Sequence, residues 1–262
     1  MAPLRLGAVS YLNARPLTWA LDRDPQRWQI RYDLPSVCAS LLAARDIHLG
    51  LVPSIEFLSA ADYRLVPGVG IGSHGAVASV ALYARVPIER VRRIALDTSS
   101  RTSVALLKVL CRRRWNIHPE FVSHPPDLVA MTTTHEAALL IGDPALEADH
   151  QSLGLSKFDL GAEWTAMTGL PFIYAAWTGP GPVGGSDIDA LQAAQAAGIN
   201  AIDDIAAEYG GADHVKVGRA AAYLRDNMRY GLGPDASAGL QLFLDYAAEI
   251  GAAPSRRALE YF

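Results

Sequence analysis

Hydroxyl side chains crowd one short segment of the sequence. Thr98 to Ser103 holds five serine or threonine residues in six positions, directly before a helix-like apolar pattern. Free backbone N–H groups at a helix N-terminus, the positive end of the helix dipole and hydroxyl donors together bind carboxylate or phosphate groups. One such residue is enough to cap a helix, so the surplus favours an anion site over ordinary capping. Ser99, Ser100, Thr102 and Ser103 are therefore candidate ligand-binding residues.

Three further corners carry polar residues after a predicted strand. They are Ser10 to Arg15, Pro53-Ser54 and Gly142-Asp143. Ligands of open α/β sheets bind beyond the carboxyl ends of the strands, so all these corners are candidates for one crevice. Asn13 can both donate and accept hydrogen bonds, although asparagine also favours tight turns. The corners predict a protein that binds a small anion, without distinguishing a receptor from an enzyme.

Several patterns that resemble known motifs are set aside. Gly70 to Gly75 matches G-x-G-x-x-G, but a strand-like run follows it where a dinucleotide site needs a helix. His135-Glu136 lacks the second histidine of a zinc protease, and the sequence has no P-loop and no nucleophile elbow. Cys38 and Cys111 have no spacing partners and are interpreted as buried free thiols. No metal site is expected.

The elements that must position these residues alternate between strands and helices, which predicts an α/β protein. Strands are predicted at 5–10, 29–33, 49–52, 79–84, 93–97, 120–124, 137–141, 158–160 and 171–177. Helices are predicted at 16–21, 36–44, 104–114, 186–209, 216–228 and 236–250. Ser36 is expected to cap the second helix, and Ser186 with Asp189 to form a capping box.

The order of these elements predicts two α/β lobes. We expect residues 1–88 and 178–262 to form a discontinuous first lobe, with residues 89–177 inserted as the second. Connections near 85–92 and 175–185 would form a two-strand hinge between them. A crevice between the lobes would then hold the ligand.

Composition narrows the class of protein. The chain has 262 residues, half of them hydrophobic, and a net charge of −4, with one basic cluster at Arg112 to Arg114 that is expected at a helix C-terminus. This distribution is not that of a nucleic-acid-binding protein. No run reaches the roughly 18 apolar residues of a membrane span, and the N-terminal residues lack the apolar stretch of a signal peptide. A cytoplasmic protein without membrane or nucleic-acid partners is expected.

Seven segments, in order along the chain, resemble the chorismate dehydratases of the futalosine route to menaquinone. They are VSYLNARPL at 9–17, LVPSIEF at 51–57, SSRTS at 99–103, IGDPAL at 141–146, DLGAEW at 159–164, TGLPF at 168–172 and YLRDN at 223–227. Each motif is modestly specific, whereas the ordered set is highly specific. The resemblance implies a type II periplasmic-binding-protein fold. It also implies removal of water from chorismate to give 3-[(1-carboxyvinyl)oxy]benzoate without a metal or organic cofactor.

Chorismate carries two carboxylates, so its pocket needs two anion sites. The helix start at Ser99–Ser103 is the candidate for one, and backbone N–H groups near Ser54 or Ser79 for the other. By resemblance, Asn13 lies in the pocket, where it would hold the departing hydroxyl or the enolpyruvyl group. The candidate catalytic residues are Asn13, Ser79 and Asp143. The candidate substrate-binding residues are Tyr11, Arg15, Ser54, Ser73, Ser99, Ser100, Thr102, Ser103 and Gly142.

The general base is not evident among these motifs. Asp143 is as well suited to a structural contact as to catalysis. One hypothesis is that the side-chain carboxylate of the substrate removes the ring proton. The gain of aromaticity favours elimination, so the protein would mainly hold a reactive conformer and exclude water.

Three alternatives remain open at this point. A solute-binding receptor shares the fold but needs export, and no signal peptide is evident. The synthase that forms 1,4-dihydroxy-6-naphthoate in the same pathway has a related fold, but its opening motif differs from Tyr11-Leu12-Asn13. A ligand-sensing regulatory module would need a DNA-binding segment, which the sequence does not show.

Overall fold

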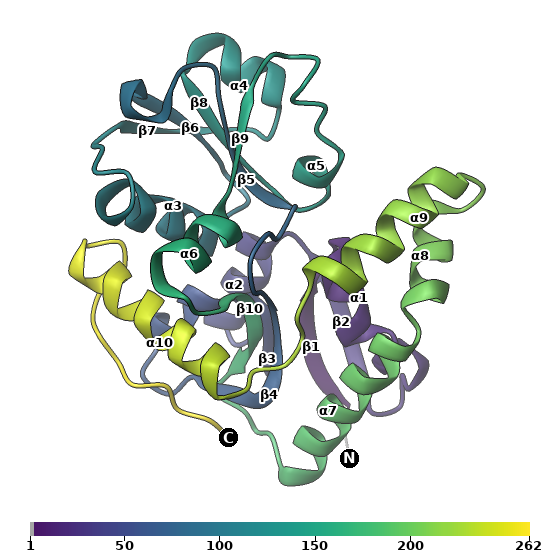
Figure 1. The fold of residues 1–262 in the computed structure, drawn as a ribbon. Helices are drawn as coiled ribbons and strands as arrows, with labels where there is room; N and C mark the ends of the chain where they lie inside the picture. The colour runs from purple at the N-terminus through teal and green to yellow at the C-terminus, as the bar shows by residue number, and fades with distance from the viewer. Residues whose placement is uncertain (1–2) are drawn as a thin grey trace.

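A computed structural model of the protein describes residues 3–262 and contains two five-stranded sheets (Figure 1). The first sheet has the order β2-β1-β3-β10-β4 and the second β7-β6-β8-β5-β9. The strands are β1 Leu4–Val9, β2 Trp28–Asp33, β3 Leu49–Pro53, β4 Arg64–Ser73, β5 Val80–Ala84, β6 Arg93–Asp97, β7 Glu120–His124, β8 Ala137–Ile141, β9 Ser156–Asp159 and β10 Phe172–Gly179. The predicted α/β class is confirmed.

Helices and 3₁₀ turns connect and cover the sheets. The helices are α1 Arg15–Thr18, α2 Pro35–Ala43, α3 Thr102–Arg113, α4 Leu128–Thr134, α5 Gly142–Glu147, α6 Leu160–Thr168, α7 Gly185–Asn200, α8 Ile202–Gly210, α9 His214–Ala222 and α10 Pro234–Glu249. The 3₁₀ turns are η1 Leu12–Ala14, η2 Leu21–Arg23, η3 Ser54–Ser59 and η4 Ile88–Arg90, and η5 Tyr223–Asn227 is a π-helical turn.

The burial of each strand follows its place in the sheet. All residues of β3, β5, β8 and β10 are buried, whereas β2, β7 and β9 at sheet edges have partly exposed residues. Continuous apolar runs such as AALLI in β8 form inner strands because both faces of the sheet are covered. Both sheets are mixed: β1 runs parallel to β2 and β3, and β10 runs antiparallel to β3 and β4. The carboxyl ends of β1, β3, β6 and β8 are where the predicted polar corners lie.

Sheet membership differs from the predicted division of the chain. Strand β5 was expected in the first lobe, but it pairs with β8 and β9 in the second sheet. Strand β10 was expected in the second lobe, but it lies between β3 and β4 in the first. Successive strands usually neighbour one another, and that rule misled the prediction because the chain changes sheets between β4 and β5. The crossings therefore fall at 74–79 and 169–171, earlier than the predicted 85–92 and 175–185.

Strand β4 was missed because its glycines resemble a nucleotide-binding loop. Its sequence is RLVPGVGIGS. A Cβ at Gly72 would lie 2.7 Å from the carbonyl oxygen of Phe172 on the paired strand β10. Glycine is thus needed here for close approach of two backbones, and the rejection of a dinucleotide site is supported by a purely structural role.

Two capping predictions were wrong. Helix α2 begins at Pro35 with Leu34 as its N-cap, because proline is favoured in the first helical turn. Helix α7 has Gly184 at its N-cap, where the backbone N–H donates to Asp187 Oδ2 over 3.1 Å. The cap therefore lies two residues before the expected Ser186. The basic residues Arg112 and Arg113 do lie in the last turn of α3, as predicted.

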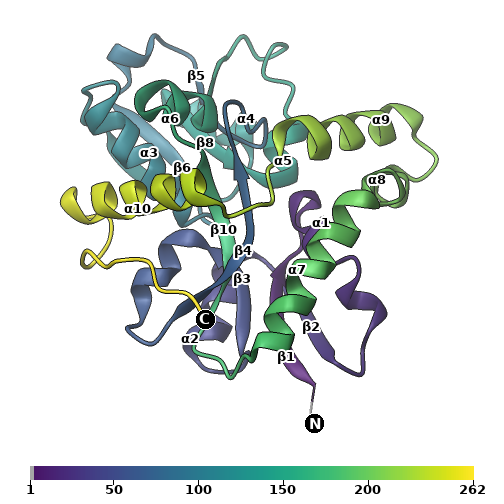
Figure 2. The same ribbon diagram turned by 60° about the horizontal axis from the view of Figure 1, so that its bottom comes forward.

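The last helix, α10, packs against both lobes. Figures 1 and 2 show it lying across α3 and beside β10, and contacts with both elements are present. Trp164 of α6, Phe172 of β10 and Phe243 of α10 form edge-to-face pairs with ring centroids 4.8–6.2 Å apart. These fully buried rings join the lobes at the second crossing. Cys38 and Cys111 are free and buried, as expected.

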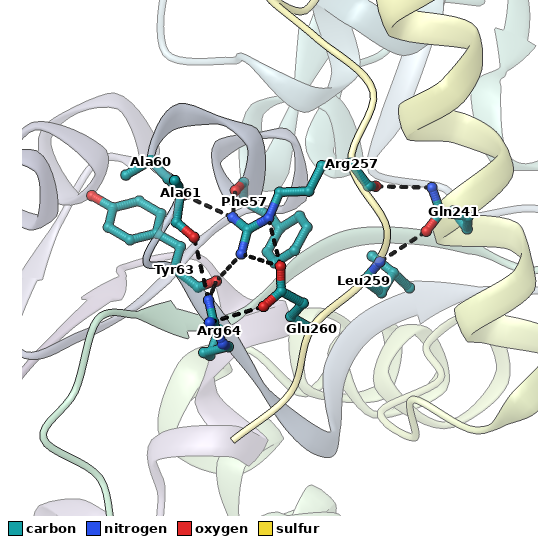
Figure 3. A network of polar contacts seen from close by, with 9 residues as sticks. All are labelled: Phe57, Ala60, Ala61, Tyr63, Arg64, Gln241, Arg257, Leu259 and Glu260. Carbon is teal, nitrogen blue, oxygen red and sulfur yellow. Dashed lines mark hydrogen bonds and ion pairs between the residues drawn. The ribbon is translucent and has the colours of Figure 1, made fainter.

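The C-terminal segment is fixed to the first lobe by Arg257 (Figure 3). Its guanidinium donates to the carbonyl oxygens of Phe57, Ala60 and Tyr63 and to Glu260 Oε1. It also lies 4.3 Å from the centroid of the Phe57 ring. Five N–H donors in a planar group can satisfy several carbonyls at the end of η3, which a lysine could not do.

Arg257→Ala is expected to lower the free energy of unfolding by about 2 kcal/mol, since buried carbonyls lose a charged donor. Arg256→Ala provides the matched control. The Arg256 side chain is 63% exposed, and its ion pair with Glu249 is long at 3.5 Å. Arg256→Ala should change the free energy of unfolding by less than about 0.5 kcal/mol. Urea denaturation measures both, and equal effects would contradict the role of Arg257.

Among residues 3–262, no helix combines the length and apolar character needed to cross a bilayer.

Candidate functional site

A pocket lies where strand ends of the two sheets meet. It holds about 500 Å³ of empty space, counting the solvent at its mouth. The residues that line it are Val9, Tyr11, Asn13, Pro35, Pro53, Ile71, Val80, Ser100, Arg101, Thr102, Ser103, Ile141, Gly142, Tyr174 and Ala175. All four predicted corners contribute, so a crevice is formed from segments far apart in the sequence.

Helix α3 directs its N-terminus toward this pocket. Ser100, Arg101, Thr102 and Ser103 line the wall, and the side chain of the N-cap residue Arg101 makes no capping hydrogen bond. The hydroxyl of Thr102 accepts the backbone N–H of Ile55 over 3.2 Å, which ties the helix start to η3 of the first lobe. The first turn of α3 thus has N–H groups that can donate hydrogen bonds to a ligand anion.

Arg101 is the cation of the pocket, and sequence reasoning missed it. Its guanidinium donates to Glu56 Oε1 over 3.0 Å, and this glutamate also accepts from Ser59. The Glu56 side chain is 8% exposed, whereas that of Arg101 is 43% exposed. One fork of the guanidinium is therefore held by a buried partner in the first lobe, while Arg101 remains open to the pocket. Its place inside the hydroxyl-rich segment was the signal that could have identified it.

Asn13 presents a polar atom without a partner. Its Oδ1 is buried and accepts no hydrogen bond from residues 3–262. Beside it lies Tyr223 of η5, whose hydroxyl is 2.7 Å from Ser79 Oγ. Burial raises the pKa of Tyr223, and hydrogen bonds from Ser79 and Asn13 oppose that shift. The Asn13 amide thus lies beside a neutral phenol, and its oxygen has no hydrogen-bond partner among the described residues.

Tyr11 and Gly142 meet from opposite lobes. Gly142 has φ +64°, and a Cβ there would lie 2.8–2.9 Å from three atoms of the Tyr11 ring. The Tyr11 hydroxyl lies 3.2 Å from Ser99 Oγ. Burial raises the pKa of Tyr11, so the phenol is neutral at physiological pH. Only glycine permits both the left-handed backbone and the close ring contact at this position.

The predicted site residues separate into two layers. Tyr11, Asn13, Ser100, Thr102, Ser103 and Gly142 line the pocket, as expected. The others that lie close behind it have protein partners: Ser54 donates to Ile173 O, Ser73 pairs with Tyr174, Ser79 with Tyr223, Ser99 with Asp97, and Asp143 with the N–H of Leu12. Their short side chains turn toward the protein because strand-end hydroxyls can satisfy neighbouring buried groups.

Arg15 lies elsewhere. Its guanidinium stacks over the Tyr209 ring of α8 at 5.5 Å, on the outer side of α1. The prediction placed it in the pocket because it belongs to the first polar corner, but α1 turns its side chain toward the C-terminal helices. Tyr174 was missed as a lining residue because it lies inside the apolar strand β10, where pattern alone indicates core.

Asp143 joins the lobes through its contact with Leu12, 3.1 Å from Oδ1 to the backbone nitrogen. Burial raises the pKa of Asp143, and the hydrogen bond from Leu12 lowers it less. A carboxyl whose pKa is higher in the folded than in the unfolded state lowers stability above that folded pKa. The cost disappears below the unfolded pKa, so stability on this account falls as pH rises between the two.

Asp143→Asn is therefore expected to stabilise the fold at about pH 7, by less than about 1 kcal/mol, and to have little effect at about pH 4. The amide oxygen still accepts from Leu12, so the inter-lobe contact remains. Urea denaturation of both proteins at the two pH values measures the difference. A variant that is less stable at neutral pH would show that the charge itself holds Leu12.

Within residues 3–262, no three His, Cys, Asp or Glu side chains gather closely enough to hold a metal ion. The polar lining includes N–H, hydroxyl and guanidinium donors at the α3 start and the side chains of Tyr11 and Asn13 in the corner after β1. Such an arrangement can bind a carboxylate at one end and a hydroxyl at the other.

The sequence matches a family model described as menaquinone biosynthesis over residues 4–249. A chorismate dehydratase from Thermus thermophilus is 29% identical over 224 residues, which cover 79% of this chain and 81% of the relative. The aliphatic sulphonate binding protein SsuA of Escherichia coli superposes with a TM-score of 0.68 at 18% identity, covering 99% of this chain and 91% of the other. SsuA from Xanthomonas axonopodis pv. citri, bound to MOPS, gives 0.68 at 19% identity, covering 99% and 96%. These neighbours confirm the predicted periplasmic-binding-protein fold.

Proposed function

The chain belongs to the menaquinone biosynthesis family, and we propose that it is a chorismate dehydratase that converts chorismate to 3-[(1-carboxyvinyl)oxy]benzoate and water. The observation that carries the proposal is the polarity of the pocket. Donors at the α3 start and Arg101 line the same pocket as Asn13, whose oxygen has no partner among the described residues, and most other lining residues are apolar. A ring with carboxylates and a hydroxyl, but little other polar surface, fits such walls.

The start of α3 and Arg101 are proposed to bind one carboxylate of chorismate. Backbone N–H groups, the helix dipole and a guanidinium act together on a single anion. Ser100 and Ser103 add hydroxyl donors in the same wall. The sequence predicted backbone N–H groups near Ser54 or Ser79 for the second carboxylate, but the N–H of Ser79 donates to Val77 O and that of Ile55 to Thr102, so we propose no site for it here.

Asn13 Oδ1 is proposed to accept a hydrogen bond from the hydroxyl that leaves the ring. Its amide is held by Tyr223, which in turn contacts Ser79, so Ser79 acts on the reaction through positioning. Asp143 acts similarly, because its carboxylate holds the backbone of Leu12 beside Asn13. These roles refine the earlier assignment of Ser79 and Asp143 as catalytic residues.

The proton that leaves the ring is proposed to go to the enolpyruvyl carboxylate of the substrate. The residues that line the pocket include no Asp, Glu or His, and burial raises the pKa of both tyrosines, Tyr11 and Tyr174. The carboxylate of the enolpyruvyl ether lies beside the ring carbon that carries this proton. After it takes the proton, the C–O bond to the neighbouring hydroxyl breaks and the same proton completes the water. The ring becomes aromatic, and the enclosed pocket excludes competing solvent.

The test is incubation of the purified protein with chorismate, followed by mass spectrometry of the product. Conversion is expected to remove one water and yield the aromatic enol ether. Asn13→Ala should slow conversion, whereas an exposed change such as Val215→Ala should not, since Val215 is 71% exposed on α9. Thermal stabilisation by chorismate without conversion would instead indicate a solute-binding protein.

A further inference from the structure

A short hydrogen-bond chain leads from a buried carboxylate to the pocket. Asp97 ends strand β6 and is 1% exposed. Its Oδ1 accepts from the backbone N–H of Ser99 over 2.9 Å and from the Ser99 hydroxyl over 2.6 Å. The next group is the Tyr11 hydroxyl, 3.2 Å from Ser99 Oγ. The chain therefore joins strand β6 of the second sheet to the corner after β1 of the first.

The direction of this chain is fixed by the number of hydrogens. Serine has one hydroxyl hydrogen, and in Ser99 it is committed to Asp97. Ser99 Oγ can then only accept, so the Tyr11 hydroxyl must donate to it. The phenol keeps its hydrogen because burial raises the pKa of Tyr11 more than the hydrogen bond with Ser99 lowers it, and the charge of Asp97 adds to the rise.

The consequence lies on the pocket side of Tyr11. With its hydrogen used inside the protein, the phenol oxygen offers the pocket only lone pairs. Asn13 Oδ1 in the same corner is also an acceptor without a partner among the described residues. The corner after β1 thus contributes the acceptor oxygens of Tyr11 and Asn13 to a pocket to which the α3 start and Arg101 contribute donors. Such a division orients a ligand that has an anionic end and a hydroxyl.

We propose that Asp97 is a positioning residue that fixes Tyr11 as a hydrogen-bond acceptor, so that the single hydrogen of the ligand's ring hydroxyl is shared between the Tyr11 oxygen and Asn13 Oδ1. This rests on the proposed function, and it assigns a role to a residue that no motif singled out. A second observation supports it: Asp97 Oδ2 is buried without a partner in residues 3–262. A half-satisfied buried carboxylate is unfavourable for the fold, which indicates a role other than stability.

The test compares two ligands that differ in the hydroxyl. Chorismate carries it, and the dehydrated aromatic product does not. Dissociation constants are measured by rapid-mixing tryptophan fluorescence for chorismate, before turnover, and by equilibrium titration for the product. Asp97→Ala removes the acceptor, so the Ser99 hydroxyl is free to donate to Tyr11 and the direction of the chain is no longer imposed. We expect about tenfold weaker binding of chorismate and a change of less than about twofold for the product.

Tyr11→Phe should show the same selectivity, and the double variant should bind chorismate no more weakly than Tyr11→Phe alone. Ser99→Ala interrupts the same chain without altering the carboxylate and is the second route if Asp97→Ala folds poorly. Equal weakening of both ligands, or additive losses in the double variant, would overturn the role of Asp97. Wild-type protein that binds chorismate without converting it would refute the proposed reaction while leaving the comparison valid. Wild-type protein that binds neither ligand would refute both.

Discussion

Gly142→Ala is expected to lower kcat/KM for chorismate by about 100-fold or more and the free energy of unfolding by about 2–4 kcal/mol. A Cβ at this position would lie 2.8–2.9 Å from the Tyr11 ring, closer than such atoms approach. Either Tyr11 leaves its place beside Ser99 or the start of α5 moves away from the first lobe. Both movements misalign the acceptor corner with the α3 wall, so activity falls more than stability alone explains.

Gly154→Ala is the matched control. Gly154 has the same φ of +64°, lies on the surface and has nothing within 4 Å of the added Cβ. It should therefore report only the backbone cost of alanine in this conformation, about 1 kcal/mol, with kcat/KM unchanged. Urea denaturation and initial rates separate the two variants. If the two variants lost the same free energy of unfolding and neither lost activity, the contact between Gly142 and Tyr11 would not matter for catalysis.

Arg101→Gln is expected to reduce kcat/KM by about 100-fold, since a charged hydrogen bond to a carboxylate contributes about 2–3 kcal/mol in a partly enclosed site. Glutamine keeps a polar side chain of similar reach but loses the positive charge and the second donor fork. Arg112→Gln on the same helix removes the same charge at the opposite end of α3. That control should leave kcat/KM within about twofold, because the site lies more than a Debye length along the helix from it.

A second variant separates substrate binding from the ion pair. Arg101→Gln leaves Glu56 buried with only Ser59 as its side-chain partner, and a stranded charge could itself distort the site. Adding Glu56→Gln removes that charge. If activity stays low in the double variant, Arg101 acts on the substrate. Recovery of activity would show that the loss came from Glu56, and the anion site would then rest on the α3 amides.

Three of the polar contacts between the lobes lie close to the pocket. Leu12 with Asp143, Ile55 with Thr102 and Glu56 with Arg101 each join a corner of the first lobe to the second. Together with the aromatic rings of α6, β10 and α10, they make lobe packing and site formation the same event. Changes that loosen the lobes are therefore expected to affect catalysis before they affect secondary structure.

Local sequence was sufficient for most elements and insufficient for the connections between them. The apolar run at β8 and the proline at the start of α1 predict their structures because periodicity and backbone restriction act over a few residues. The sequence of β4 did not predict a strand, because its glycines are required by the close approach of β10, which lies about 100 residues later in the chain. The lobe boundaries failed similarly, since strand pairing between β5 and β8 is a long-range choice.

The same distinction holds for the site. The sequence by itself determined the α/β class, the resemblance to chorismate dehydratases and the corners that line the pocket, because strand ends and helix starts leave polar groups that must face a crevice. Only the tertiary structure decided which side chain at each corner faces the ligand. In the structure, Ser54, Ser79 and Asp143 bond to protein partners and Arg15 stacks on Tyr209. Arg101 lines the pocket, and Tyr223 lies beside Asn13. Hydrogen-bond partners are chosen among groups that meet only after the lobes pack, and no spacing along the chain records that choice.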